Sequence, residues 1–287
     1  MPHPSDPSRH HRPAHHMVGA EAAHARDHAE VLDLDADVVG HLEELTAWVG
    51  AHLRDEPTAV LDIGAGSGSG TLALAERFPR AEIVALDESA QMIDHLERAA
   101  SASGLADRIR TVRADADEDW PAIGTFDLAW ASSSLHHMRN PDRVLRSARA
   151  ALAVDGVLAV VEMDGLPRFL PPESGSGRPG LEERCRAAMA GAGWNAHPDW
   201  SGHLRSAGFD LVEQRTFSYL RAPAPPLAWR YAERVFTNVR AHLADRLAPH
   251  DLEAIDELLD DRAPGSLAQR RDLVVRSART IWLARRG

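Results

Sequence analysis

The sequence predicts an α/β fold in which a mostly parallel sheet is covered by helices on both faces. Three observations predict it. Short apolar segments such as TAVLDI (58–63) and GVLAVVE (156–162) are typical of strands buried on both sides. Segments with apolar residues at helical spacing lie between them, as in parallel strands joined by crossover helices. A glycine-rich turn follows the first strand, where open α/β sheets build their ligand sites.

Seven strands are predicted along the chain. The first five are separated by helices, expected over 72–77, 89–102 and 141–152, and give a Rossmann-like, doubly wound sheet. The last two strands enclose two amphipathic helices at about 227–247 and 250–260, so they are not a tight hairpin but are free to pair around a helical insertion. In chain order the strands are 58–63, 82–86, 109–114, 126–131, 156–162, 209–219 and 272–284.

The chain divides into five regions on the same grounds. A His-rich start with several prolines predicts a disordered tail, with no spacing that would place the imidazoles as metal ligands. Asp37 is the candidate N-cap of a helix that ends near Leu53. The regions are the tail (1–28), an N-terminal helical cap (29–57), the core (58–220, with a mobile Gly- and Pro-rich loop at 164–180), a helical insertion or lid (221–269) and a C-terminal strand (270–287).

Composition excludes several classes of protein. The formal net charge of −11 disfavours a protein that binds nucleic acid through its phosphates, because that needs a cationic surface. All 32 positive charges are arginines, which excludes a Schiff-base lysine and a GxxxxGK phosphate loop. The one cysteine, Cys185, forms no internal disulfide, and no apolar run approaches the length of a membrane span. We therefore expect a cytoplasmic protein without nucleic-acid or membrane partners.

The segment most informative about function is VLDIGAGSGSG at 60–70, where a strand ends in Asp62 and glycines follow at alternate positions. Glycine lets the backbone turn sharply and approach a ligand near the N–H groups that begin the next helix. This geometry suits a dinucleotide or a nucleoside with a zwitterionic tail. The dinucleotide pattern GxGxxA does match at 68–73, but it begins six residues after the acid instead of directly after the strand.

Polar residues at the ends of the next strands favour a nucleoside. Asp87 ends the second strand 19 residues after Gly68, where a carboxylate can accept both hydroxyls of a ribose. Asp115 follows the third strand, where it can accept a hydrogen bond from an adenine amino group. The fourth strand runs into ASSSLHHM (131–138), which places small polar residues and two imidazoles at the same edge of the sheet.

Taken in order, these segments resemble the class I S-adenosylmethionine-dependent methyltransferases. They are VLDIGAGSG, ALDES with Gln91 and Met92, RADAD, and FDLAWASSSLHHMRNPDRVLRSARAAL with DGVLAVVE. The branch they resemble is the small-molecule enzymes related to quinone-biosynthesis methyltransferases. The resemblance covers about 59–162, with a weaker match in HPDWSGHLRSAGF, and it departs from the family's Pro-Gly-Gly turn at 154–156.

The resemblance implies a donor, a product and an acceptor class. The cofactor is S-adenosyl-L-methionine and the product S-adenosyl-L-homocysteine. The acceptor is a small molecule with an oxygen, nitrogen or carbon nucleophile, plausibly of secondary metabolism, and a homodimer is the expected assembly. Two alternatives stay open on the residues alone: an NAD(P)-dependent oxidoreductase, and a nucleoside-binding protein whose site no longer catalyses methyl transfer.

The resemblance also implies roles for the motif residues. Gly64, Gly66 and Gly68, with Ala65 between them, would approach the methionine portion of the donor. Asp62 would orient the turn and, through water, the amino group.

At the other end of the donor, Asp87 would bind the ribose hydroxyls. Glu88 and Met92 would flank the ribose and adenine, although Met92 is equally expected as helix core. Asp115 and Ala116 would meet the adenine edge.

Catalysis is expected at the end of the fourth strand. Ser132 would lie beside the sulfonium, and His136 and His137 are the candidate bases if the acceptor must lose a proton, since imidazoles titrate near neutral pH. His28 is a further candidate from the N-terminal segment. Structural histidines with catalysis by proximity alone are the alternative. Asp127, at the start of this strand, is expected to be structural.

The acceptor pocket is less defined. The N-terminal helix, the loop at 165–180 and the helices at 227–260 are expected to line it. The aromatic candidates for an apolar wall are Trp194, Trp200, Trp229, Tyr231 and Phe236, and the candidates to pair with an acidic acceptor are Arg230, Arg234 and Arg240.

Overall fold

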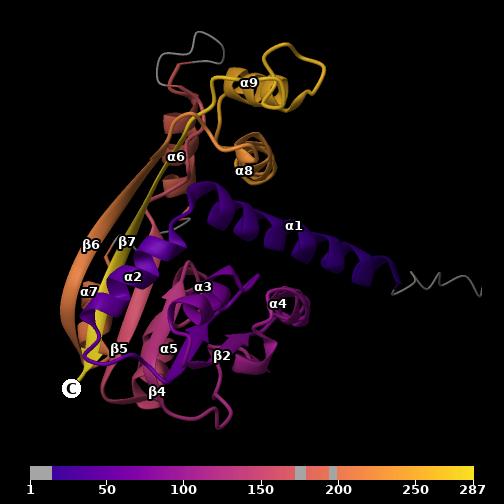
Figure 1. Cartoon of the computed structure of the whole chain (residues 1–287). Coiled ribbons are helices and arrows are strands. Elements are labelled where there is room, and N and C mark those ends of the chain that lie inside the picture. The colour runs from indigo at the N-terminus through magenta and orange to yellow at the C-terminus, as the bar shows by residue number, and fades with distance from the viewer. Residues whose placement is uncertain (1–14, 172–178, 194–198) are drawn as a thin grey trace, which may run out of the picture.

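A computed structural model describes residues 15–171, 179–193 and 199–287 (Figure 1). Its seven-stranded sheet has the order β3-β2-β1-β4-β5-β7-β6, and all strands are parallel except β7, which pairs antiparallel with both neighbours. The predicted fold is therefore confirmed. The strands are β1 (Ala59–Ile63), β2 (Glu82–Asp87), β3 (Ile109–Arg113), β4 (Phe126–Ser132), β5 (Leu152–Met163), β6 (Phe209–Arg221) and β7 (Val275–Arg286).

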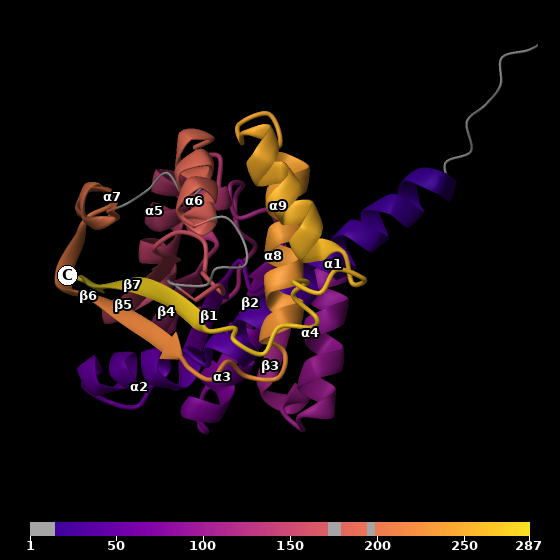
Figure 2. The same cartoon turned by 90° about the horizontal axis from the view of Figure 1, so that it is seen from above.

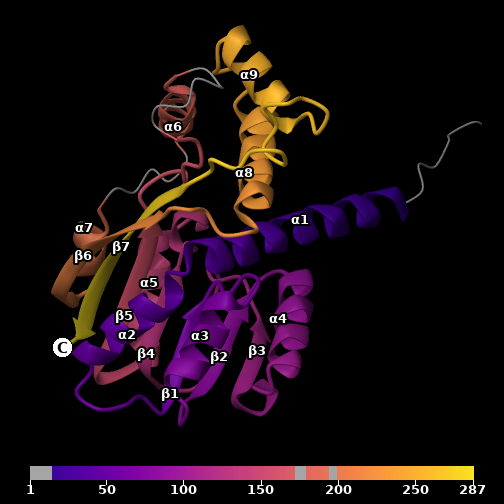
Figure 3. The same ribbon diagram turned by 45° about the horizontal axis from the view of Figure 1, so that its top comes forward.

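Helices cover both faces of this sheet. Three further helices, α6, α8 and α9, form a separate group called the cap from here on, which is distinct from the N-terminal segment 29–57. Figures 2 and 3 show α6, α8 and α9 gathered beyond the carboxyl ends of the parallel strands, with α1 running between this cap and the sheet. The helices are α1 (His15–Val39), α2 (Leu42–His52), α3 (Ser69–Arg77), α4 (Ala90–Ala102), α5 (Pro141–Ala151), α6 (Leu181–Gly191), α7 (Ser201–Ser206), α8 (Ala228–His242) and α9 (Pro249–Leu259), with short 3-10 turns η1 (Ala106–Arg108) and η2 (Leu135–His137).

The N-terminal helices differ from the prediction in two ways. Helix α1 begins at His15, so the disordered tail predicted for 1–28 is wrong from that residue onward, while 1–14 lie outside the described residues. The sequence has no proline from 14 to 56, which removes the main obstacle to a long helix. Asp37 lies inside α1 and is not an N-cap, because the chain breaks instead at Gly40, where φ is +62°.

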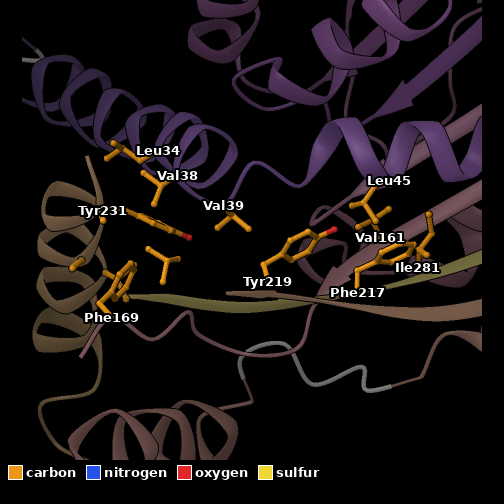
Figure 4. Close-up of a cluster of buried hydrophobic side chains, with 14 of the residues drawn as sticks. Leu34, Val38, Val39, Leu45, Val161, Phe169, Phe217, Tyr219, Tyr231 and Ile281 are labelled. Atoms are coloured by element: carbon orange, nitrogen blue, oxygen red, sulfur yellow. The ribbon is translucent and has the colours of Figure 1, made fainter. Parts of the chain in front are cut away.

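The two faces of the sheet bury separate apolar clusters. Successive residues of a strand point to opposite faces, so Val60 joins a cluster with α2 and α3, whereas Leu61 joins one with α5 and α7. The first cluster continues into the cap. Figure 4 shows Val38 of α1 near Tyr231 of α8, with further apolar side chains following along β6 and β7. Helix α1 is therefore packed between the cap and the sheet.

The strand order places a switch point between β1 and β4. Strands β2 and β3 extend the sheet to one side of β1, while β4 and β5 extend it to the other. The crossover helices consequently diverge at this point, and open α/β sheets bind ligands in the crevice that results. In the register of this pair, Asp62 of β1 lies opposite Trp130 of β4.

Candidate active site

A cavity of about 520 Å³ opens at the switch point, a volume suited to a small-molecule ligand. The carboxyl ends of β1, β2 and β4 and the loops after them form its floor. One face of α1 forms its roof, because His28, Leu32, Asp35 and Ala36 follow one another at helical spacing. Figure 3 shows α1 lying across this edge of the sheet, below the cap.

The first strand ends in a buried carboxyl group that faces this cavity. Asp62 accepts a hydrogen bond from the Thr71 hydroxyl at 2.6 Å. Burial raises the pKa of Asp62 to about 7, although the bond from Thr71 acts in the opposite direction and the nearby Asp87 in the same one. The Asp62 carboxyl group is thus bonded to the first turn of α3, and it lines the cavity.

The three glycines of the loop are needed for its backbone shape. Gly64, Gly66 and Gly68 have φ values of +70°, +55° and +90°, where side chains are strained. A Cβ at Gly66 would lie 2.9 Å from Leu32 of α1, and one at Gly68 would lie 2.2 Å from Leu96. Glycine therefore lets both α1 and α4 pack closely against the loop, while Gly64, Ala65 and Gly66 also line the cavity.

Asp87 connects the loop with the helix that follows β2. Its carboxylate accepts hydrogen bonds from the backbone N–H groups of Gly66 and Ser89, each at 2.9 Å. Each oxygen keeps a second lone pair, and Asp87 lines the cavity together with Glu88 and Met92. The carboxylate is thus fixed at the position where the sequence places a ribose-binding acid.

The wall after β3 is bound by an arginine of the turn after η2, which the sequence analysis missed. Asp115 and Ala116 line the cavity as expected, but Asp115 also accepts a hydrogen bond at 2.8 Å from Arg139. Asp117 accepts hydrogen bonds from the backbone N–H groups of Arg139 and Asn140. These bonds connect the loop after β3 with the turn after η2. Each oxygen of the Asp115 carboxylate accepts one hydrogen bond, Oδ2 from Arg139 and Oδ1 from the backbone N–H of Asp117.

The two candidate bases after β4 occupy different surroundings. Ser132 lines the cavity, and so does His137. Partial burial lowers the pKa of His137 to about 4, and the imidazoles of His136 and His28 act in the same direction. His136 instead turns toward the end of β5, where its Nδ1 lies 2.7 Å from the buried carboxylate of Glu162.

No pattern in the sequence marks Glu162 as a site residue. It is the last acid of an apolar strand, and only the pairing of β4 with β5 brings it beside η2. Because a carboxylate only accepts, its partner Nδ1 carries the proton and Nε2 of His136 is left with a lone pair. This arrangement orients His136 and selects one tautomer.

Helix α1 is fastened to the floor of the cavity by a second acid. Asp33 accepts a hydrogen bond at 3.0 Å from the Ser69 hydroxyl, at the start of α3. Its other oxygen lies 2.9 Å from Nε2 of His95 on α4. These contacts join residues 36 and 62 positions apart, so no local pattern could have predicted them.

A buried ionic cluster closes the end of the cavity toward the cap. Both oxygens of Asp35 accept from the fully buried Arg279, at 2.5 and 2.6 Å, and Oδ1 also accepts from Tyr231 at 2.6 Å. Burial would raise the pKa of Asp35, but Arg279 and His41 hold it below its usual value. Burial lowers the pKa of His41 to about 4, so its imidazole is neutral near pH 7.

Other candidates lie away from the cavity. Tyr231, Phe236 and Trp200 are core residues, and Trp229 packs against the core, so none of these forms the expected acceptor wall. Trp194 lies outside the described residues. Asp127 is structural, as predicted, since it accepts hydrogen bonds from Thr58 and Ala59.

The arginines of α8 are paired within the protein. Arg230 and Arg234 form ion pairs with Glu30 of α1, and Arg240 pairs with Asp256 of α9.

The Gly- and Pro-rich loop predicted at 164–180 is described only in part, because 172–178 lie outside the described residues. Before that gap, Phe169 is buried, and its backbone N–H donates a hydrogen bond to Glu182 of α6.

Comparison with known proteins agrees with this site. A family model described as a methyltransferase domain matches residues 61–158. A malonyl-[acyl-carrier protein] O-methyltransferase of Geobacter sulfurreducens is 32% identical over 180 residues, which are 53% of this chain and 65% of that protein. A trans-aconitate 2-methyltransferase of Deinococcus radiodurans is 33% identical over 111 residues, 38% of this chain and 40% of that protein. The chain thus spans less than two thirds of either relative.

A solved structure shows the same fold over most of the chain. It is that of a Bacillus halodurans protein assigned as a methyltransferase, with a TM-score of 0.54 at 17% identity, covering 85% of this chain and 98% of the other. That structure shows the fold alone, and the sequence matches make this chain similar to methyltransferases, the class that its motif residues resemble. No helix in the described part of the chain is long and apolar enough to cross a membrane.

The cavity fits the cofactor of this class better than a dinucleotide. The residues 69–73 of the GxGxxA pattern lie inside α3, so that pattern does not form the loop ahead of the helix that a pyrophosphate needs. Carboxylates at Asp87 and Asp115 match ribose hydroxyls and an adenine amino group. At the opposite end, the buried Trp130 indole N–H has no hydrogen-bond partner among the described residues and lies next to Asp62, which suits a ligand with a polar tail.

Proposed function

We propose that this protein transfers the methyl group of S-adenosylmethionine to a small-molecule acceptor. The observation that carries the proposal is the cavity at the switch point, which is lined by Asp62, by the glycine loop at 64–66 and by Asp87. The methyltransferase-domain match over 61–158 supports it. An acceptor from secondary metabolism and a homodimeric assembly stay predictions.

The donor-binding roles follow from what each side chain can accept or donate. Asp87 would accept the ribose hydroxyls through its remaining lone pairs, and Asp115 with Ala116 would meet the adenine edge. Glu88 and Met92 would flank these groups. The bound cofactor would supply an activated methyl group, and the roof formed by α1 would exclude water from it.

Acceptor chemistry is proposed to take place between η2 and α1. His137, which lines the cavity, would take the proton of a hydroxyl acceptor, while His136, held by Glu162 at 2.7 Å, packs against it with 4.0 Å between the ring centroids. His137, neutral because of its lowered pKa, would hydrogen-bond the acceptor at the cavity wall. Ser132 would lie beside the reacting methyl group.

The test uses methyl-labelled S-adenosylmethionine and a panel of phenols, alcohols, amines and carboxylic acids. We expect label to enter a small molecule, and we expect His137→Ala to slow transfer to a hydroxyl acceptor by roughly a hundredfold. Asp127→Asn is the control, because that acid lies outside the cavity. Label in no compound, despite donor binding, would contradict catalysis and support a vestigial site.

A further inference from the structure

The two edge strands of the sheet differ in length and in charge. At one edge, β3 has five residues, and its charged side chains are Arg110 and Arg113. At the other edge, β6 has 13 residues and pairs, within the described part of the chain, with β7 alone. Figures 1 and 3 show β6 as the outermost strand on that side of the molecule. A long edge strand presents a row of unpaired backbone N–H and C=O groups, which can pair with another chain.

Most of β6 is regular enough to pair with a further strand. A bulge interrupts its register with β7 between Leu211 and Glu213. Over 213–221, in contrast, nine successive residues face nine successive residues of β7 without a shift. This segment contains neither proline, which would remove a backbone donor, nor glycine, which would weaken the strand. The bulge thus limits the region available for pairing to 213–221.

Exposed apolar side chains are concentrated along the same edge. Among the described residues, the large apolar side chains that are exposed are Val154, Val212, Leu220 and Leu227. The last three lie in β6 or shortly after its end, and Leu220 is 62% exposed. Exposed apolar residues scattered over a surface need no explanation, but their bias toward one open strand edge indicates that this edge meets a partner.

The charges of 213–221 are complementary to a second copy of the same segment. Glu213 begins it and Arg221 ends it. If two copies pair antiparallel about a two-fold axis at Phe217, Glu213 of each copy lies opposite Arg221 of the other, which gives two opposite-charge pairs. A parallel pairing in the same register would place like charges opposite each other. The residues of β3 include no acid, so two copies of that strand would repel each other in either direction.

Contacts within the chain hold both charged side chains close to the edge. The side chain of Glu213 is 45% exposed, and its Oε2 lies 3.0 Å from Nε2 of His52 on α2. Arg221 is half-buried; it donates a hydrogen bond to the carbonyl of Val39, and its guanidinium carbon lies 5.5 Å from the ring centroid of Tyr219. A carboxylate has two oxygens and a guanidinium has five N–H groups, so both side chains can still bind a partner.

We propose that two copies of this chain pair antiparallel through 213–221 of β6 and join their sheets into one. The backbone of Phe217 in one copy lies opposite that of Phe217 in the other, and Thr216 lies opposite Ser218. All of 213–221 are described residues, and none of them lines the cavity at the switch point. This surface is therefore separate from the proposed methyl-transfer site, and its test does not depend on that activity.

Charge reversal tests the pairing, and sedimentation velocity over a dilution series measures the dissociation constant of the dimer. Wild type should be dimeric, and its dissociation constant should rise with salt concentration. Glu213→Arg should raise the dissociation constant by roughly tenfold or more, because two attractive pairs become repulsive, and Arg221→Glu should do the same. The double variant of Glu213→Arg with Arg221→Glu should return it to within about threefold of wild type, since opposite charges again face each other.

Two controls separate the pairing from a general effect of charge. Glu213→Arg with Arg215→Glu has the same net charge as the restoring double variant, but Arg215 lies opposite Tyr219 in this register, so it should not restore the dimer. Glu253→Arg, at an exposed position of α9, should leave the dissociation constant unchanged. Thermal melts check that every variant is folded.

Several results would overturn the proposal. One is wild-type protein that stays monomeric up to about 0.5 mM. Another is a dimer that Glu213→Arg does not weaken. Failure of the double variant with Arg221→Glu to restore the dimer, or restoration by the variant with Arg215→Glu, would exclude pairing about Phe217.

Discussion

Two parts of this molecule, the strands β1 to β5 and the cap with β6 and β7, are held together by contacts that span different distances along the sequence. Between β1 and β5, the site residues follow strand ends at short spacing, as with Asp62 and Asp87. In the cap and the last two strands, the contacts that fix the structure span long sequence distances, such as Arg279 with Asp35 (244 positions) and Arg184 with Asp251 (67 positions). The first part forms the floor of the cavity that we propose as the donor site, and the second holds α1 over that cavity.

This difference predicts whether a substitution should change ligand affinity or stability. Changes in the parallel half should alter ligand affinity, because its polar groups face the cavity. Changes in the long-range contacts should alter stability, because one member of each pair, Arg279 or Asp251, is buried and depends on its partner. Five predictions, from the largest expected effect to the smallest, test that division.

Asp35→Ala should lower the free energy of unfolding by about 3–5 kcal/mol, since it leaves the fully buried Arg279 without its carboxylate. Chemical denaturation measures this loss. A variant that replaces both partners, Asp35→Leu with Arg279→Met, should recover much of it, because the uncompensated charge is then gone. A loss below about 1 kcal/mol in the single variant would show that the cluster does not fasten α1 to the cap.

His41 should make stability fall on acidification. Its folded pKa of about 4 lies below the ordinary 6.5, so the unfolded chain binds the proton more readily. This contribution is complete above pH 6.5 and is lost as the pH falls toward 4. Between pH 7.5 and 5, wild type should lose about 2 kcal/mol more than His41→Asn in chemical denaturation.

The titration of Asp62 changes the free energy of unfolding with pH in the opposite direction to that of His41, so it provides a check on the His41 experiment. Its folded pKa of about 7 is raised above 3.8, so its contribution is present at low pH and is lost as the pH rises toward 7. Asp62→Asn should therefore make the loss of stability on acidification steeper than in wild type. Identical pH profiles for His41→Asn and wild type would contradict the buried, neutral imidazole.

Asp87→Ala should weaken binding of S-adenosylhomocysteine by about 1–3 kcal/mol, because the ribose loses its hydrogen-bond acceptor. Calorimetry measures the change. Asp127→Ala is the matched control in the same half, since it also removes a carboxylate that binds backbone N–H groups but lies outside the cavity. Unchanged affinity in Asp87→Ala would remove this residue from the site.

Asp256→Ala should have no measurable effect on stability or binding. Its partner Arg240 is solvent-exposed, and exposed ion pairs contribute little because water screens both charges. Thermal melts measure the stability, and calorimetry measures the affinity for S-adenosylhomocysteine. A clear loss of affinity would connect the outer cap with the donor site, contrary to the division drawn above.

The sequence predicted the fold and the strand-end motifs because both depend on local patterns. Apolar runs, glycines at alternate positions and acids at strand ends placed Asp62 and Asp87 correctly at the cavity. It also implied that one member of the His136–His137 pair faces the site, and His137 does line the cavity.

The rest required the three-dimensional pairing of distant elements. Glu162 meets His136 only through the pairing of β4 with β5, and Trp130 meets Asp62 only through β1 and β4. The aromatic residues of α8 resembled a pocket wall in composition, but amphipathic spacing does not specify which surface a helix buries against. Tyr231 is accordingly core, and its hydroxyl binds Asp35.

The most direct test of the central claim is calorimetric titration of the protein with S-adenosylhomocysteine, with NADH as the parallel control. Binding of S-adenosylhomocysteine alone, with micromolar affinity, is the predicted result, because the acids and the glycine loop suit a nucleoside with an amino-acid tail. Binding of NADH alone would contradict the methyltransferase site, and it would place a pyrophosphate at the start of α3.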